Sequence, residues 1–238
     1  MKNAIIIGAS SGIGRELAKM LATDGYSIAI TARRVQLLNE LHDELPGDVL
    51  VRKMDVSDPD SSKALLSEII GKMGGADLIV FAAGTGEINE QLNWQLEHTC
   101  IMTNVSGFAA IANVAIRQFI KQKSGHFVAI SSISAIRGGG ASPAYHASKS
   151  FLSNYLEGLR QKVTKLQLPI TVTDIKPGFV DTAMAKGEGQ FWVAPVNKAA
   201  SQIYQAIRKK KSHCYVTRRW RLIAWLLKVL PDSLYIRL

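Results

Sequence analysis

The sequence predicts a single doubly wound α/β domain, with about seven parallel strands and helices on both faces of the sheet. Short apolar runs alternate with longer segments whose apolar residues recur at three- and four-residue spacing, as Leu17, Met20 and Leu21 do. The 238 residues, 47% hydrophobic and 20% charged, suffice for one domain with a sizeable core. No repeat, low-complexity stretch or linker divides the chain.

The first half of the chain alternates strands and helices in order. A strand at 3–8 is the apolar run that ends at Gly8. Glycine and proline pairs, Pro46-Gly47 and Gly74-Gly75, end two of the helices. The expected elements are a strand at 3–8, helix at 12–24, strand at 26–32, helix at 35–45, strand at 48–53, helix at 59–73 and strand at 76–82.

The second half continues the alternation. Helices are expected at 92–122, 143–166 and 195–210, and strands at 125–131, 168–175 and 213–217. No stretch approaches the roughly 20 apolar residues that a spanning helix needs, and we expect no signal peptide. Cys100 and Cys214 show no disulfide spacing, so we expect a reduced, cytoplasmic protein.

A glycine-rich turn joins the first strand to the first helix. Its sequence is Gly8-Ala9-Ser10-Ser11-Gly12-Ile13-Gly14. Glycine lets the backbone turn tightly and approach a pyrophosphate, and a helix N-terminus offers free N–H groups with the positive end of its dipole. The spacing is G-x-x-x-G-x-G instead of the commoner G-x-G-x-x-G. The turn predicts a dinucleotide-phosphate site.

Two arginines at the end of the second strand indicate which dinucleotide binds. The strand ends Thr31-Ala32-Arg33-Arg34, with no acidic residue. A carboxylate there would bind the free ribose hydroxyls of NAD, whereas arginine pairs with a 2′-phosphate. The alternative is that both arginines simply end the strand at the surface. We expect NADP(H).

Tyr145 and Lys149 are the candidate catalytic pair. Residues four apart share a helix face, and an ammonium beside a phenol is expected to lower the pKa of the tyrosine from about 10. Ser132, thirteen residues before Tyr145, would hydrogen-bond the same substrate oxygen, with Ser131 as its rival. His146 is expected to point elsewhere on the helix.

Taken in order, these motifs resemble the short-chain dehydrogenase/reductase family over residues 3–195. The resemblance implies a Rossmann fold with strand order 3-2-1-4-5-6-7. It implies a catalytic domain at 1–195, with the last helix and strand of the same domain and a basic apolar helix at 196–238. It also implies a homodimer or homotetramer.

The resemblance carries residue roles as well. Asn104, Ser132, Tyr145 and Lys149 match the catalytic tetrad, in which Asn104 would hold a water linked to Lys149. The implied cofactor contacts are Gly8, Ser10, Ser11, Gly12, Ile13, Gly14, Arg33, Arg34, Asp55, Val56, Ala83, Gly84, Tyr145, Lys149, Pro177, Gly178, Val180 and Thr182. Two departures are Ile7, where the family usually has Thr, and Phe81-Ala82-Ala83-Gly84, where it has Asn-Asn-Ala-Gly.

The expected activity is NADP(H)-dependent interconversion of a carbonyl and an alcohol, with Tyr145 as general acid or base. A non-catalytic NADP(H)-binding sensor or scaffold, or an epimerase or dehydratase on the same fold, stays open. A lid at 183–194 carries Met184, Phe191 and Trp192 and, with Phe179, suggests an apolar small-molecule substrate. The histidines show no ligand spacing, so no metal is expected.

The positive charge is concentrated in the C-terminal fifth. Residues 196–238 hold ten Lys or Arg and one acid, Asp232, against nineteen basic and eighteen acidic residues elsewhere. Within 208–230, basic residues and tryptophans flank the apolar run 222–227, a pattern typical of an anchor at an anionic membrane surface. That would place the protein at the cytoplasmic face of a membrane. Packing on its own core or on a second subunit is an equal alternative; no motif supports nucleic acid.

Overall fold

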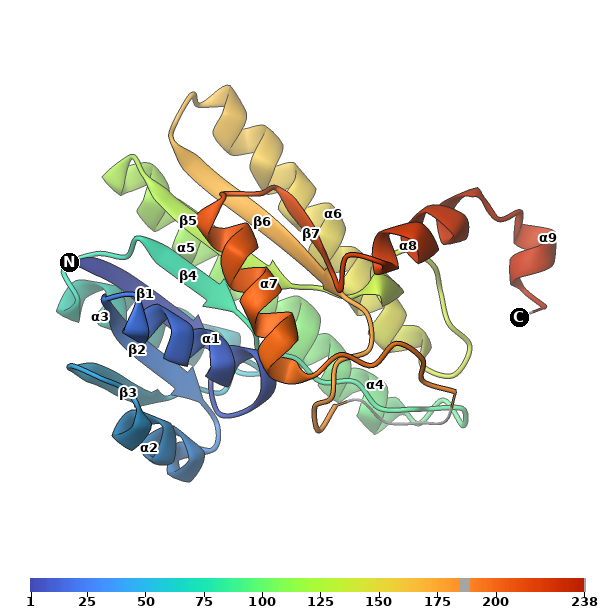
Figure 1. Ribbon diagram of the computed structural model, residues 1–238, viewed down its shortest axis with the longest axis horizontal. Coiled ribbons are helices and arrows are strands. Elements are labelled where there is room, and N and C mark those ends of the chain that lie inside the picture. The colour runs from blue at the N-terminus through green and yellow to red at the C-terminus, as the bar shows by residue number, and fades with distance from the viewer. Residues whose placement is uncertain (185–188, 238) are drawn as a thin grey trace.

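The computed structural model describes residues 1–184 and 189–237 (Figure 1). Seven parallel strands form one sheet in the order β3-β2-β1-β4-β5-β6-β7, which confirms the predicted fold class and strand order. The strands are β1 (Lys2–Ile7), β2 (Tyr26–Ala32), β3 (Val49–Lys53), β4 (Leu78–Phe81), β5 (Gly125–Ile130), β6 (Ile170–Pro177) and β7 (His213–Val216).

Helices cover both faces of this sheet (Figure 1). On one face, apolar side chains of α1, α2 and α7 pack in a single core cluster with the strands. On the other face, α3, α5 and α6 form a second cluster. The bounds are α1 (Gly12–Thr23), α2 (Val35–Glu44), α3 (Pro59–Lys72), α5 (Phe108–Gln122), α6 (Pro143–Lys165) and α7 (Val196–Arg208).

The strand order reverses beside β1. This strand pairs with β2 on one side and with β4 on the other, so Ile7 lies opposite both Thr31 and Phe81. The chain therefore leaves β1 in one direction and returns on its other side. In open parallel sheets, such a reversal creates a crevice at the carboxyl ends of the strands, where ligands bind.

The helix predicted at 92–122 consists of three parts. The α-helix α4 (Trp94–Cys100) continues into a π-helical segment, η1 (Ile101–Gly107), and then into α5. Single π-helical turns are rare and frequently occur at functional sites. A Cβ on Gly107 would lie 2.2 Å from the carbonyl oxygen of Val56, so only glycine allows this approach. The segment contains the buried Asn104.

The same helix corrects an expectation about hydropathy. Trp94–Gln122 is long and apolar enough to cross a membrane by length and composition, the one such helix among the described residues. The prediction that no segment reaches this limit is therefore wrong. Half of its most apolar window is buried, and Phe108, Ile111 and Phe119 pack in the core beneath the sheet. Its hydropathy is that of a core helix.

The replaced asparagine motif has a structural compensation. Phe81 is fully buried, and its ring lies edge-on to that of Phe108 with 5.4 Å between centroids. Such aromatic pairs contribute about 0.5–1.5 kcal/mol beyond their buried area. Ala82 donates a backbone hydrogen bond of 2.8 Å to the Ile7 carbonyl, which ties β4 to β1. The aromatic pair thus packs β4 against α5, and the backbone hydrogen bond joins β4 to β1 at this point.

The chain ends in two helices beyond the sheet edge, α8 (Trp220–Val229) and the unpredicted α9 (Asp232–Tyr235) (Figure 1). They connect back to the loop that follows a short 3₁₀ turn, η2 (Ile133–Ala135). Arg137 pairs with Asp232 at 2.6 Å and lies over the Tyr235 ring at 4.3 Å. Tyr235 also donates a hydrogen bond to the Gly138 carbonyl. These contacts dock α9 on the body.

Candidate active site

A cavity of about 810 Å³ opens at the carboxyl ends of the strands. The glycine turn, the ends of the central strands, the first turns of α6 and the inner side of α8 line it. Every sequence-predicted site residue lines this cavity except Asp55 and Asn104. The Asp55 carboxylate instead accepts hydrogen bonds from the Ser57 amide and hydroxyl, at 3.0 and 2.7 Å. The structure thus brings nearly the whole predicted set into one site.

The glycine turn is shaped by close contacts that exclude a side chain. Gly8 has φ +93°, and a Cβ there would lie 2.5 Å from the Ala83 nitrogen. A Cβ on Gly14 would lie 2.2 Å from the Gly8 oxygen. Ser11 is the N-cap of α1, and among the described residues its side chain makes no capping hydrogen bond. The first amides of α1 therefore keep free donors beside the cavity. Such donors fit a dinucleotide phosphate.

Arg34 reaches over this turn. Its Nη2 donates hydrogen bonds to the hydroxyls of Ser10 at 2.9 Å and Ser11 at 2.7 Å. Arg33 also lines the cavity. Among the described lining residues, none at this end of β2 carries a carboxylate. The site therefore presents two guanidinium groups and two hydroxyls where β2 meets the turn, a donor set suited to a phosphate.

The half-buried side chain of Tyr145 lines the cavity and is hydrogen-bonded to the Ser132 hydroxyl. Burial raises the pKa of Tyr145, and the Ser132 hydrogen bond lowers it by less. The Lys149 Nζ lies 5.6 Å from the phenol ring centroid and donates a 3.0 Å hydrogen bond to the Ile130 carbonyl. The predicted net lowering of the Tyr145 pKa is therefore wrong, because burial outweighs the interactions that lower it. The phenol is protonated at neutral pH.

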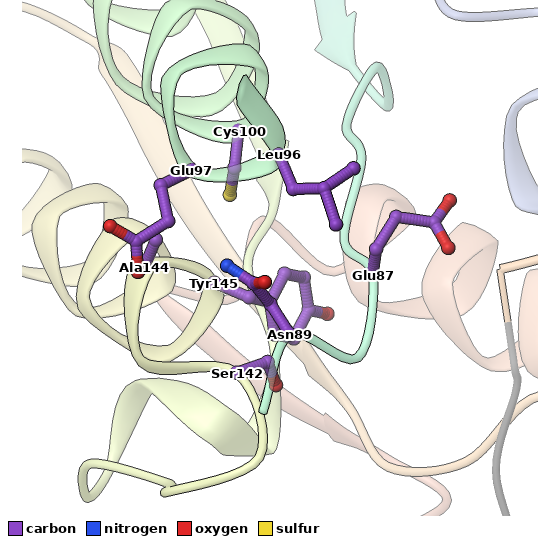
Figure 2. Close-up of a pocket in the computed structure, with 8 residues that line it drawn as sticks. All are labelled: Glu87, Asn89, Leu96, Glu97, Cys100, Ser142, Ala144 and Tyr145. Atoms are coloured by element: carbon purple, nitrogen blue, oxygen red, sulfur yellow. The ribbon is translucent and has the colours of Figure 1, made fainter. Parts of the chain in front are cut away.

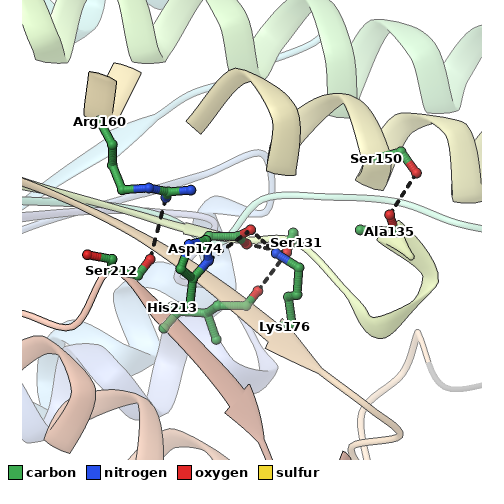
Figure 3. A network of polar contacts seen from close by, with 9 residues as sticks. Ser131, Ala135, Ser150, Arg160, Asp174, Lys176, Ser212 and His213 are labelled. Atoms are coloured by element: carbon green, nitrogen blue, oxygen red, sulfur yellow. Dashed lines mark hydrogen bonds and ion pairs between the residues drawn. The ribbon is translucent and has the colours of Figure 1, made fainter. Parts of the chain in front are cut away.

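The two serine candidates are separated by their partners. The Ser131 hydroxyl donates to Asp174 Oδ1 at 2.5 Å and to the Ile175 carbonyl at 2.9 Å. Figure 3 shows Ser131 beside the buried Asp174 and its ion-pair partner Lys176, with the exposed His213 at the edge of this group. Ser131 thus has its hydroxyl committed below the site, while that of Ser132 contacts Tyr145.

Lys149 belongs to α6, and its side chain is buried. Burial lowers its pKa to about 8, although nearby Cys100 and Asp174 raise it. A lysine is charged below its pKa, so Lys149 carries its positive charge at neutral pH. A positive charge one helical turn from Tyr145 favours the phenolate that forms when the phenol gives up its proton.

Asn104 holds the loop after β4 in place. Its Oδ1 accepts a 2.9 Å hydrogen bond from the Thr85 amide, and its Nδ2 donates 2.7 Å to the Thr85 carbonyl and 3.0 Å to the Ser148 hydroxyl. A Cβ on Gly84 would lie 3.4 Å from both the Asn104 Oδ1 and the Lys149 Nζ. Asn104 therefore positions the loop against α6, and its water-holding role stays a prediction.

The same loop packs against the back of Tyr145. A Cβ on Gly86 would lie only 2.4 Å from Cδ2 of the tyrosine ring. Behind the ring is a small pocket of about 10 Å³, roughly the space of one water molecule. Figure 2 shows the residues around Tyr145: Glu87 and Asn89 from this loop, Leu96, Glu97 and Cys100 from α4, and Ser142 and Ala144 beside it.

Several lining residues were missed by sequence reasoning. His146 lines the cavity, and its Nδ1 lies 2.8 Å from the Arg137 carbonyl, so the prediction that it points elsewhere is wrong. The C-terminal segment contributes Trp220, Ile223, Leu227 and Tyr235. Only the helical spacing of the first three could have indicated a buried face, and nothing local indicated what it covers.

The predicted apolar wall is present in part. Phe179, Met184 and Phe191 line the cavity. The ring of Trp220 lies 5.5 Å from that of Phe179 and 5.0 Å from that of Phe191. Residues 185–188 of the predicted lid lie outside the described residues.

Comparison with known proteins agrees with this geometry. A sequence profile described as short chain dehydrogenase matches residues 2–191. An uncharacterized oxidoreductase from Myxococcus xanthus is 37% identical over 188 residues, covering 77% of this chain and 74% of that protein. Two solved structures share the fold at lower identity. They are a short-chain dehydrogenase from Sphingobium yanoikuyae in complex with NADPH (TM-score 0.82, 19% identity, 98% of both chains) and a short chain dehydrogenase/reductase from Burkholderia phymatum in complex with NAD (TM-score 0.84, 20% identity, 94% of this chain and 92% of that one).

Proposed function

The chain belongs to the short-chain dehydrogenase family of oxidoreductases, and from this premise we propose that it reduces an apolar ketone or aldehyde with NADPH. The observation that carries the proposal is the half-buried, protonated Tyr145, which lines the cavity and is hydrogen-bonded to Ser132. A neutral phenol is a proton donor, so the site suits reduction of a carbonyl at neutral pH.

The residues of the chain divide the chemistry among them. When bound, the dinucleotide supplies the hydride. As negative charge grows on the carbonyl oxygen, the Ser132 hydroxyl hydrogen-bonds it and Tyr145 donates its proton to it. The charged Lys149 stabilises the phenolate left behind. In the oxidising direction the same phenolate would act as the base.

NADP(H) is proposed because of the donors around the glycine turn. Arg34 and Arg33 lie at the end of β2 beside the glycine turn, and Ser10 and Ser11 add hydroxyl groups there, a donor set that supports binding of a 2′-phosphate. The aromatic wall of Phe179, Phe191 and Trp220 favours an apolar substrate, because burying polar groups against it without partners costs free energy.

The test compares Tyr145→Phe with the wild type in NADPH oxidation assays over a panel of apolar ketones and aldehydes. Loss of the proton donor is expected to lower kcat by about 10²–10⁴-fold while NADPH still binds, as followed by fluorescence. Tyr155→Phe is the matched control, because Tyr155 lies on the same helix but packs against Phe108. No turnover of the panel by the wild type, with NADPH still bound, would support a non-catalytic sensor. Equal turnover in both variants would contradict the role of Tyr145 as proton donor, and products other than the alcohol would support an epimerase or dehydratase.

A further inference from the structure

Helix α8 carries two apolar stripes on opposite sides. The inner stripe, Trp220, Ile223 and Leu227, lines the cavity. The outer stripe consists of Leu222, Trp225, Leu226 and Val229, which are 69%, 64%, 49% and 54% exposed. Both follow the three- and four-residue spacing of a helix face. The outer side of a surface helix in a globular protein is normally polar, so the outer stripe points to a partner.

Further exposed apolar side chains lie beside the start of α8 and in the terminal segment. Phe191, Trp192 and Val193 are exposed, and Trp192 is fixed to the start of α8 by Arg219. The guanidinium of Arg219 lies 4.8 Å over the Trp192 ring and donates a 3.1 Å hydrogen bond to its carbonyl. Exposed apolar side chains also occur in the terminal segment, at Leu234 and Ile236. Aromatic side chains and a short apolar helix are therefore presented together.

The charges that border the outer stripe are positive. Arg221 and Lys228 lie at its edge by helical spacing, and Arg218 and Arg237 are exposed nearby in the chain. The single acid of the C-terminal fifth, Asp232, pairs with Arg137 at 2.6 Å. The face thus combines apolar side chains with basic ones, as interfacial helices do.

The structure also divides the basic tail. The run 208–211 precedes β7, and Arg218 follows it, so the strand separates the two basic groups. The Lys211 carbonyl accepts a hydrogen bond from Thr173, which places that run beside β6. Only the second basic group accompanies the apolar stripe. The expected surface at 208–230 is therefore two separate basic regions.

We propose that the outer stripe of α8, with residues 191–193, docks on an anionic lipid surface. The apolar side chains would enter the headgroup region, and Arg221 and Lys228 would contact lipid phosphates. A helix of ten residues is about 15 Å long, too short to span a bilayer. A second copy is the weaker occupant, because a two-fold contact pairs this face with itself and so brings two positively charged surfaces together.

Docking would also place the cavity wall at the lipid, because the inner stripe of the same helix lines the cavity. A lipid-soluble carbonyl compound could then enter beside α8 without crossing water. This consequence rests on the proposed function, whereas the docking itself does not.

The test is co-sedimentation of the purified full chain with phosphatidylcholine vesicles, with and without phosphatidylglycerol. The wild type is expected to bind the anionic vesicles at low salt and to be released at high salt, since screening weakens contacts between exposed charges. The double variant Leu222→Gln, Trp225→Gln is expected to bind at least tenfold more weakly. Trp94→Gln is the matched control, because Trp94 is 65% exposed but lies on α4.

A second pair of variants locates the charge contribution. Replacing Arg221 and Lys228 by Gln is expected to weaken binding about 30-fold, from the usual contribution of each basic residue near an anionic surface. The same change at Arg208 and Lys209 is expected to leave binding unchanged. An equal loss in both pairs would overturn the assignment to α8.

Three further results would overturn the proposal. They are no co-sedimentation of the wild type at low salt, wild-type binding by the outer-stripe variant, and a lipid-free dimer that this variant converts to a monomer in sedimentation velocity. Turnover of a water-soluble ketone is measured in parallel, without vesicles. Failure there with intact vesicle binding would count against the proposed function alone.

Discussion

At the level of single residues, the site depends on two ionisable groups one helical turn apart, the half-buried Tyr145 and the buried Lys149. Burial shifts their pKa values in opposite directions, because it disfavours the charged form, which is the phenolate of Tyr145 and the ammonium of Lys149. It raises the pKa of the Tyr145 phenol and lowers that of the Lys149 ammonium to about 8. At neutral pH both groups are therefore protonated, one neutral and one positive.

This pairing predicts a pH limit for reduction. As pH rises through about 8, Lys149 loses its proton and with it the charge that stabilises the phenolate, so kcat for reduction is expected to fall. Lys149→Arg, which stays charged at any of these pH values, is expected to move the falling limb to higher pH. A limb at the same pH in both proteins would contradict a role for the charge.

A second prediction concerns Arg34. Arg34→Ala is expected to raise the KM for NADPH about 10- to 100-fold, from loss of a charged hydrogen bond of about 1.5–3 kcal/mol, and to change the KM for NADH little. The measurement is steady-state kinetics with both coenzymes. Arg15→Ala is the control, because Arg15 bonds to Leu37 and Glu44. Equal losses for the two coenzymes would mean that Arg34 only holds the glycine turn.

At the level of elements, the loop after β4 packs against α6, the helix that carries Tyr145 and Lys149. The segment after β4 is held by Asn104 through both backbone groups of Thr85 and then lies against the Tyr145 ring at Gly86. Asn104 itself comes from the π-helical segment η1. The orientation of Tyr145 therefore depends on packing between this loop, η1 and α6.

Gly86→Ala tests this dependence. The added methyl would lie 2.4 Å from the Tyr145 ring, so the loop or the ring must shift. We expect kcat to fall about 10²-fold, as a displacement of about 1 Å can cause, with the Kd for NADPH nearly unchanged. Gly138→Ala is the control, because nothing lies within 4 Å of that Cβ. Unchanged turnover in Gly86→Ala would show that the ring position is not critical.

At the level of the whole molecule, stability is linked to a buried histidine between the strands. Burial, aided by nearby Lys210, lowers the pKa of His126 to about 4, and its Nε2 lies 2.7 Å from the Thr173 hydroxyl. Between about pH 6.5 and 4 the unfolded chain binds a proton that the folded chain does not. The free energy of unfolding is therefore expected to fall by about 3 kcal/mol as pH drops through this range.

Denaturant unfolding across this pH range measures the effect. His126→Gln keeps a donor for Thr173 but does not titrate, so its stability is expected to fall less steeply below pH 6.5. His42→Gln, at an exposed position, is the control. An equally steep decline in His126→Gln would assign the acid loss to other groups.

The quaternary arrangement also belongs to this scale. The homodimer or homotetramer implied by the family stays a prediction, and so does the division at residue 195. Helix α7 and strand β7, which follow that residue, belong to the same sheet and core as the rest. Sedimentation velocity without lipid, used above, measures the oligomeric state as well.

The sequence by itself determined the order of elements, the glycine turn and the Tyr145–Lys149 pair, because these depend on local periodicity and spacing. Tertiary structure alone decided that Ser132 and not Ser131 contacts the tyrosine, since Asp174, 43 residues away, binds Ser131. It also decided the direction of the Tyr145 pKa shift and the docking of α9 on Arg137. Tertiary structure likewise decided which face of α8 lines the cavity and which face is exposed. Burial and charge pairing arise between residues far apart in the chain, so local sequence does not fix them.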